Sequence, residues 1–271
     1  MCVRIKLCNF AVMKLADCDR TRIMGIINLT PDSFYKDSRM GSTDAVMAQI
    51  KLMIDNGADA IDIGACSTRP GFTAIPAEEE IKRLEAVLPT VRAEYPDLLI
   101  SIDTFLPQVA EHCLKEWHVD IINDISGGSP EMYRIVAMHG ATYILTYNEE
   151  IEEDVTSEML EFFRLKISEL HNVGLKKVIV DPGFGFSKTL EQNYQALNCI
   201  DALHRMGYET LVGISRKSMI YKILHNTPQE ALNGTTVLHT LAVQQNASWL
   251  RVHDVKEAVE VVRILETIKN I

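Results

Sequence analysis

The sequence lacks the features that would place it in a membrane or in a disulfide-stabilised class. No apolar run reaches the about 18 residues that a membrane-spanning helix needs. The first twenty residues hold no continuous apolar segment and carry an acid by Asp17, a poor pattern for a secretory signal. The six cysteines (2, 8, 18, 66, 113 and 199) form no C-x-x-C pair and no zinc spacing. We therefore expect reduced thiols and a cytoplasmic location.

Positive charge is also in deficit, since 27 Lys and Arg stand against 37 Asp and Glu, giving a net charge of −10. This balance argues against a general nucleic-acid or membrane surface but leaves room for a local basic pocket. A length of 271 residues suits one large α/β domain or two smaller ones. No linker, repeat or low-complexity segment interrupts the chain. We therefore expect one domain over residues 1–271, in which residues 1–20 form an extension; a hairpin at the bottom of the domain is one arrangement for it.

Apolar runs and amphipathic stretches alternate along the chain. Each short run is rich in β-branched residues, as in parallel strands buried on both faces, and each is followed by a stretch of helical periodicity. Thr43 is the expected cap of the first helix, Pro76 starts the next, and one helix is expected over about 190–205. Eight such units predict a (β/α)8 barrel, with an open doubly wound sheet as the alternative. The predicted strands are 23–27, 60–63, 98–102, 119–122, 141–145, 177–180, 211–213 and 248–251.

Polar residues gather where these strands end, which is where active sites lie in (β/α)8 barrels. We expect no comparable cluster at the strand starts. One strand end is DPGFGFSK (181–188), where a proline and two glycines force a sharp turn beside an acid. The local pattern fits a phosphate cradle or an ordinary strand-to-helix turn.

Two groups of strand-end residues suggest two kinds of contact. The first, the heterocycle set, suits a flat ring with several N–H donors and a carbonyl. It consists of Asp103, Asn123, Asp181 and Lys217. The second, the anion set, suits a phosphate or diphosphate. It consists of Asn28, Thr68, Arg69, Arg251 and His253. Asn28 and Asp32 offer the hard oxygen ligands that Mg²⁺ prefers.

Several of these residues also have a structural interpretation. Asp62 could be a buried acid satisfied by backbone amides, and Asn123 could only order its loop. Arg69 and Lys188 could be solvated charges at the rim, and for Lys188 we favour that interpretation. Arg251 and His253 are two residues apart, so we expect both to point to the same face.

Seven motifs in this order resemble those of the dihydropteroate synthases of folate biosynthesis, and the match runs from about residue 22 to the C-terminus. They are MGIINLTPDSF (24–34), CSTRPG (66–71), SIDT (101–104), IINDISG (121–127), DPGFGFSK (181–188), VGISRKSM (212–219) and RVHDV (251–255).

The resemblance implies condensation of 6-hydroxymethyl-7,8-dihydropterin diphosphate with p-aminobenzoate, giving 7,8-dihydropteroate and diphosphate. The heterocycle set would bind the pterin, with Asp103, Asp181 and Lys217 taking part in catalysis. The anion set would bind the diphosphate, with Mg²⁺ held through Asn28 and Asp32. The p-aminobenzoate site would be shaped by Thr68, Pro70, Phe186, Lys217 and Ser218. The resemblance also implies a homodimer and a target of sulfonamides.

The chain departs from the family pattern at three places. Thr146-Tyr147-Asn148 stands where many members have a Met-His-Met-type stretch, and Cys66 where many have Glu. The first loop reads SFYKDS rather than a glycine-rich run. Loops 28–41 and 64–75 are long, and we expect them to close over the diphosphate.

Two other functions remain to be weighed. A pterin-binding methyltransferase domain, acting on a methyl-folate and a corrinoid, would keep the heterocycle set without needing the anion set. A paralogue that only binds pterin would be expected to lose Asn28, Arg251 or Lys217, and all three are present.

Overall fold

The computed structural model describes residues 20–29, 39–66 and 75–271, apart from the side chains of residues 39–42. Eight parallel strands close into a barrel in chain order, and β1 pairs with both β2 and β8. The predicted (β/α)8 barrel is confirmed, because a closed sheet excludes the open doubly wound alternative. The strands are β1 (Arg22–Asn28), β2 (Ala60–Gly64), β3 (Leu99–Asp103), β4 (Ile121–Asp124), β5 (Thr142–Thr146), β6 (Val178–Asp181), β7 (Glu209–Val212) and β8 (Trp249–Val252).

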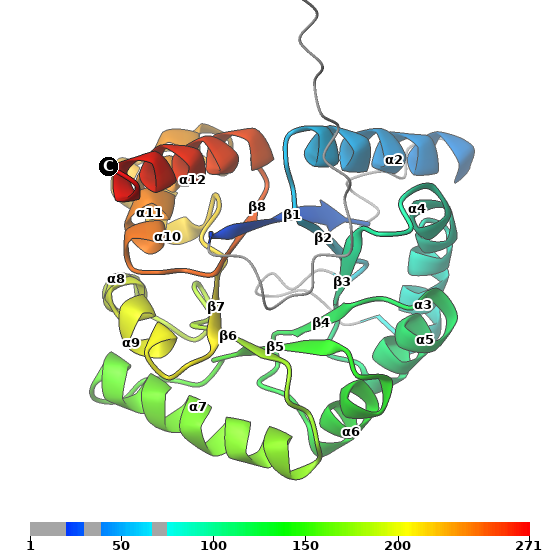
Figure 1. The fold of residues 1–271 in the computed structure, drawn as a ribbon, viewed down its shortest axis with the longest axis horizontal. Helices are drawn as coiled ribbons and strands as arrows, with labels where there is room; N and C mark the ends of the chain where they lie inside the picture. The colour runs from blue at the N-terminus through cyan, green and yellow to red at the C-terminus, as the bar shows by residue number, and fades with distance from the viewer. Residues whose placement is uncertain (1–19, 30–38, 67–74) are drawn as a thin grey trace, which may run out of the picture.

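Helices form a ring around the strands (Figure 1). Among the described residues, none of them is both long and apolar enough to cross a membrane. The helices are α2 (Arg39–Asp55), α3 (Ala77–Glu85), α4 (Leu88–Glu94), α5 (Pro107–Trp117), α6 (Pro130–His139), α7 (Val155–Asn172), α8 (Leu190–Asn198), α9 (Ile200–His204), α10 (Ser218–Leu224), α11 (Leu232–Gln244) and α12 (Val255–Lys269), with a 3₁₀ turn η1 (Pro228–Glu230) before α11.

Three helix boundaries differ from the predictions. Helix α2 begins at Arg39, one turn before Thr43, whose hydroxyl donates to the Ala86 carbonyl at 3.3 Å instead of capping the helix. The segment after Pro76 divides into α3 and α4, because Pro89 in the first turn of α4 has no N–H to continue the helix. The segment 190–205 divides at Cys199, whose N–H bonds back to the Ala196 carbonyl at 3.1 Å.

The inside of the barrel changes from apolar to polar along the strands. A buried apolar layer crosses it, formed by Met24, Ala60, Ile121, Ile144, Ile179, Leu211 and Trp249. Two residues further on, the same face carries a polar residue on four strands: Asp62, Asn123, Asp181 and Arg251. The strand register also places Asn28, Gly64, Asp103 and Asn123 at one level. The fold therefore delivers the predicted strand-end residues to one end of the barrel.

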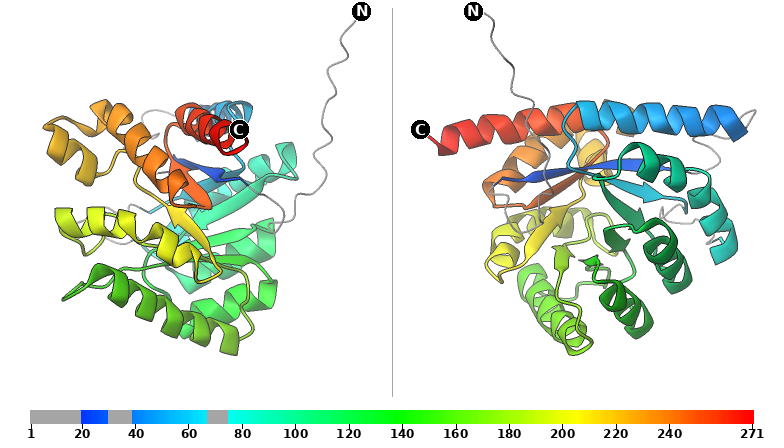
Figure 2. Two further views of the ribbon diagram at one scale, coloured as in Figure 1. Left: turned by 60° about the vertical axis from the view of Figure 1, so that its left-hand side comes forward. Right: turned by 45° about the vertical axis from the view of Figure 1, so that its right-hand side comes forward.

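Closure of the barrel depends on close packing against β1. Helices α12 and α2 both contact this strand, and Figure 1 shows them on either side of it, on the outside of the barrel, where Figure 2 also shows them. A Cβ atom on Gly25 would lie 2.7 Å from the sulfur of Met53 in α2 and 3.3 Å from Val255 in α12. The absence of a side chain at Gly25 lets both helices approach the strand.

Charged side chains also gather at the amino ends of the strands, so the prediction that these ends carry no cluster is wrong. The Arg22 guanidinium donates to Glu209 and lies 4.1 Å above the Trp249 ring, whose Nε1 donates to the other Glu209 oxygen at 2.7 Å. Asp59 accepts from Arg20 and from the Ile23 N–H. Both oxygens of Glu209 and both oxygens of Asp59 are paired. We therefore interpret this cluster at the amino ends as structural.

Candidate active site

Arg251 extends from β8 into the barrel and pairs with two buried carboxylates. Its Nε donates to Asp62 at 2.6 Å, and its Nη2 donates to Asp103 at 2.7 Å. Burial opposes the charge of this guanidinium, but Asp62 and Asp103 outweigh it and raise the pKa of Arg251. The sequence suggested separate acidic and basic groups. The structure instead joins an acid of the heterocycle set to an arginine of the anion set in one ion-paired cluster.

Asp62 holds this cluster together from β2. It is fully buried, and the oxygen that accepts from Arg251 also accepts from Asn123 Nδ2 at 3.1 Å. The interpretation of Asp62 as an acid satisfied by backbone amides is therefore wrong, since its partners are side chains. The sequence could have indicated this role, because Asp62 is two residues after Ala60 and its side chain therefore points into the barrel. Asn123 contributes to the same cluster rather than only to its own loop.

Asp103 sits at the end of β3 and is 5 % exposed. Burial raises its pKa to about 7, with Arg251 opposing the shift and Asp62 adding to it. Among the described residues, no donor meets Oδ1 of Asp103 or Oδ1 of Asp62. Buried acceptors without a donor are costly, and a ligand bearing N–H groups would satisfy them.

Asp181 at the end of β6 interacts with Lys217, which lies directly before α10 in the loop after β7. Burial raises the pKa of Asp181, although Lys217 opposes the shift. Burial lowers the pKa of Lys217 to about 8, with Asp181 acting in the other direction. A Cβ on Gly213 would lie 3.9 Å from Asp181 Oδ2 and 4.0 Å from Lys217 Nζ, so this glycine leaves open the space beside both groups. Lys217 Nζ also lies 4.8 Å above the Phe186 ring.

Lys188 is packed inside the loop that follows β6, so its interpretation as a solvated rim charge is wrong. Its Nζ donates to the carbonyls of Tyr147, Gly183 and Phe186 at 3.0–3.2 Å and lies 4.6 Å above the Tyr147 ring. Burial lowers the pKa of Lys188 to about 8. The turn is not a phosphate cradle in this arrangement. Its lysine binds two carbonyls of its own loop and one of the loop after β5, and the Gly183 N–H donates to Asp181 at 2.8 Å.

The remaining predicted residues border the same end of the barrel. Asn28 is exposed at the end of β1, and a Cβ on Gly64 would lie 3.8 Å from Asn28 Oδ1 and 3.7 Å from Asp103 Oδ2. His253 Nδ1 is 3.0 Å from the Ser215 hydroxyl, so its partner differs from those of Arg251. Ser218 begins α10 and is half-buried. The predictions for Asp32, Thr68, Arg69 and Pro70, and for closure of the first two loops, lie outside the described residues.

The structure gives roles to the departures from the family pattern. Tyr147 is 2 % exposed and packs edge-on against Phe162, so most of its side chain belongs to the core. Asn148 bridges two loops, donating to the Ile125 carbonyl at 2.9 Å and accepting from Ser187 at 3.1 Å. The Cys66 thiol is buried, which raises its pKa and makes it a poor nucleophile.

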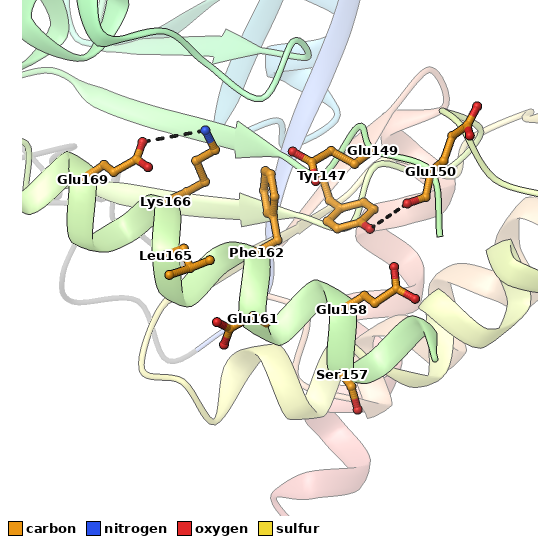
Figure 3. A pocket seen from close by; sticks show the side chains of 10 residues that line it. All are labelled: Tyr147, Glu149, Glu150, Ser157, Glu158, Glu161, Phe162, Leu165, Lys166 and Glu169. Carbon is orange, nitrogen blue, oxygen red and sulfur yellow. Dashed lines mark hydrogen bonds and ion pairs between the residues drawn. The ribbon is translucent and has the colours of Figure 1, made fainter. Parts of the chain in front are cut away.

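A groove of about 630 Å³ lies along α7 and the loop that follows β5 (Figure 3). Leu165 and Phe162 contribute its apolar part, and glutamates border it; Lys166 and Glu169 face each other at 3.7 Å. The groove contains none of the predicted site residues. Convergent buried polar groups mark the site better than concavity does, so we place the active site at the carboxyl ends of the strands.

The chain matches known proteins over most of its length. The model of the family described as "Pterin binding enzyme" matches residues 24–253. The dihydropteroate synthase of Clostridium beijerinckii is 37 % identical over 248 residues, covering 88 % of this chain and 91 % of the relative. The chain belongs to the dihydropteroate synthase family. The dihydropteroate synthase of Bacillus subtilis is 34 % identical and covers 93 % of this chain and 90 % of its own.

Solved dihydropteroate synthases share the fold. The structure of the Clostridium difficile protein in the presence of pteroic acid has a TM-score of 0.88 and 36 % identity, covering 92 % of this chain and 97 % of its own. The Xanthomonas albilineans protein with 4-aminobenzoic acid has a TM-score of 0.88 and 33 % identity, covering 93 % and 94 %. The same protein has also been solved with 7,8-dihydropteroate, at a TM-score of 0.84. The resemblance seen in the sequence motifs is therefore confirmed.

Proposed function

We propose that the chain condenses 6-hydroxymethyl-7,8-dihydropterin diphosphate with p-aminobenzoate, giving 7,8-dihydropteroate and diphosphate. It is a transferase of the dihydropteroate synthase family. The observation that carries the proposal is the buried cluster of Asp62, Asp103 and Arg251 at the carboxyl ends of the strands. The solved relatives with pteroic acid, 4-aminobenzoic acid or 7,8-dihydropteroate support the substrate class.

The pterin would lie against the acidic residues of the heterocycle set. Asp103 Oδ1 has no donor among the described residues and can accept a ring N–H. Asp181 offers a second carboxylate, and Asn123 an amide oxygen. Lys217, which lies between Asp181 and Phe186, would donate to a ring carbonyl or nitrogen. A ring with N–H donors would thereby replace the hydrogen bonds that these buried acceptors lack.

The diphosphate would bind on the side of Asn28, Arg251 and His253, together with Thr68 and Arg69 of the second loop. The donor set fits Mg²⁺, because Asn28 Oδ1 faces the same space as Asp103 Oδ2 beside Gly64, and Mg²⁺ on a diphosphate needs only one or two protein ligands. Asn28 and, outside the described residues, Asp32 would hold the ion. When bound, Mg²⁺ supplies charge that stabilises the diphosphate as it leaves.

The chemical step is substitution at the pterin methylene. The bond from the methylene carbon to the diphosphate oxygen breaks, the arylamine nitrogen forms the new bond to that carbon, and the arylamine releases one proton. Arg251 stabilises charge on the leaving diphosphate, while Asp103 and Asp181 stabilise positive charge that develops on the pterin. The described cysteines are buried, and the reaction needs no covalent intermediate on the protein.

The p-aminobenzoate would enter beside the loop after β6. Phe186 and Lys217 lie against each other there, and Ser218 follows Lys217 at the start of α10. Thr68 and Pro70 would complete this side. The methyltransferase alternative is not favoured, because it does not need the arginine and histidine at the end of β8.

We also propose that the chain forms a homodimer through α11 and α12, which neighbour each other at the upper left of Figure 1. Val237 and Leu241 on α11 are 53 % and 42 % exposed, and Ile264 and Ile268 on α12 are each 62 % exposed. Apolar side chains gathered on adjacent helices are typical of interfaces. Replacing Val237 by Glu should shift the protein toward monomer in sedimentation velocity. A wild-type profile would place the interface elsewhere.

A cytoplasmic location remains part of the proposal, in keeping with the described cysteines, which are free and buried.

The test is diphosphate release from purified protein given both substrates and Mg²⁺. Release should require p-aminobenzoate and should stop when Mg²⁺ is chelated. A folded protein that releases no diphosphate under these conditions would contradict the proposed function.

A further inference from the structure

Asp62 is placed to control two residues that meet different parts of the substrate. It is 0 % exposed, and one of its oxygens accepts from both Asn123 Nδ2 and Arg251 Nε. These partners come from β4 and β8, on opposite sides of β2 in the closed barrel. A single buried carboxylate therefore links the residue assigned to the pterin with the residue assigned to the diphosphate.

The contact to Asn123 determines which end of its amide faces the ligand. A carboxylate only accepts hydrogen bonds, so it selects the orientation with Nδ2 toward Asp62. Oδ1 of Asn123 then points away from Asp62, and no described residue donates to it. The residue is thereby presented as an acceptor, which suits a ring with N–H groups. If the amide turned over, it would present a donor instead of an acceptor to the ligand.

The contact to Arg251 determines where its guanidinium lies. Asp62 binds Nε and Asp103 binds Nη2, which fixes the plane of the group at two points. Nη1 makes no hydrogen bond to another described residue. A planar guanidinium held on two nitrogens keeps its remaining N–H groups in a set direction, which favours binding to an oxyanion.

We propose that Asp62 is the positioning residue of the site: it orients the Asn123 amide as an acceptor for the pterin and orients Arg251 for the diphosphate. Asp62 needs no contact with either substrate for this role. The inference rests on the proposed function for the identity of the ligands, but its test requires only binding.

The test uses the full-length protein and calorimetric titration with two probes: 6-hydroxymethylpterin without diphosphate, and inorganic diphosphate with Mg²⁺. In Asp62→Asn, the replacement amide can turn a donor toward Asn123 and Arg251. Affinity for each probe should fall about tenfold, the size expected for losing a hydrogen bond to a charged group. The KM for p-aminobenzoate at saturating pterin diphosphate should stay within about twofold, because neither partner of Asp62 belongs to the proposed p-aminobenzoate site.

The matched control is Asp59→Asn, which removes a carboxylate of the same segment at the other end of the barrel. It should leave both affinities unchanged. Asp62→Ser provides a second variant if Asp62→Asn does not fold, and binding is counted only for the folded fraction measured by urea unfolding. In the Arg251→Lys background, Asp62→Asn should cost little further diphosphate affinity, because the two changes break one interaction.

Wild-type affinity for both probes in folded Asp62→Asn would overturn the proposal. Equal losses for both probes and for p-aminobenzoate would also overturn it, because they would indicate general damage to the barrel. Absence of turnover in the wild-type protein would contradict the proposed function, yet it would leave these binding results intact.

Discussion

Both ends of the barrel carry buried charges, but they differ in whether the carboxylate oxygens have hydrogen-bond donors. At the amino end, Glu209 has partners for both oxygens in Arg22 and Trp249, and Asp59 is likewise fully paired. At the carboxyl end, Asp62 and Asp103 each keep one oxygen without a donor among the described residues. Unsatisfied buried acceptors destabilise a fold, so their presence at one end marks where a ligand completes the hydrogen bonds. Charge alone does not separate the two ends, whereas the pairing of the carboxylate oxygens does.

The largest expected effect on activity follows from Lys217→Ala at the carboxyl end. Loss of a positioned cation beside Asp181 should lower kcat by at least about 10²–10³-fold and leave the fold intact. Steady-state diphosphate release and circular dichroism would measure the two quantities. The matched control is Lys222→Ala, an exposed lysine on α10. A wild-type rate in Lys217→Ala would remove this lysine from the site.

The pH dependence of kcat/KM should reflect the titration of two groups at the carboxyl end of the barrel. Asp103, whose pKa is raised to about 7, must be ionised, so kcat/KM should fall as the pH drops below that value. Lys217, whose pKa is lowered to about 8, must be protonated, so kcat/KM should also fall at higher pH. Activity should peak between these values and decline about tenfold per pH unit on each side. A flat profile from pH 6 to 9 would contradict both assignments.

A smaller effect is expected from Lys188→Met, which removes the cation that holds three loop carbonyls. The Phe186 side of the site should loosen, and kcat/KM for p-aminobenzoate should fall about tenfold, by analogy with loss of supporting hydrogen bonds around a site. Lys176→Met, at an exposed position, is the control. Unchanged kinetics would show that this lysine stabilises the loop without serving the reaction.

The smallest effect on activity is expected at the amino end. Glu209→Ala leaves the Arg22 guanidinium and the Trp249 N–H without this acceptor, which should lower the free energy of unfolding by about 1–3 kcal/mol. kcat and KM should stay as in the wild type. Urea unfolding compared with Glu260→Ala, an exposed position on α12, measures the difference. A loss of kcat without a loss of stability would erase the distinction between the two ends.

The sequence was sufficient for the barrel and for the strand ends at which the candidate site lies. Apolar runs revealed all eight strands, and Asp103, Asn123 and Asp181 could be recognised because each ends such a run. The pairing of Arg251 with Asp62 could not be predicted, because it spans 189 positions and depends on the closure of β1 between β2 and β8. Similarly, Lys188 follows a glycine turn, a position typical of a surface lysine. Its burial depends on the neighbouring loop of Tyr147, which the sequence does not reveal.

That neighbouring loop bears on how such a protein could be re-engineered. A Cβ on Gly183 would lie 2.0 Å from the Tyr147 carbonyl oxygen, while Lys188 and Ser187 bind Tyr147 and Asn148. The loops after β5 and β6 therefore form one structural unit, which should be exchanged between relatives as a whole. A chimaera that takes one loop from a relative and keeps the other from this chain would inherit mismatched contacts, whereas exchanging the two together would preserve them.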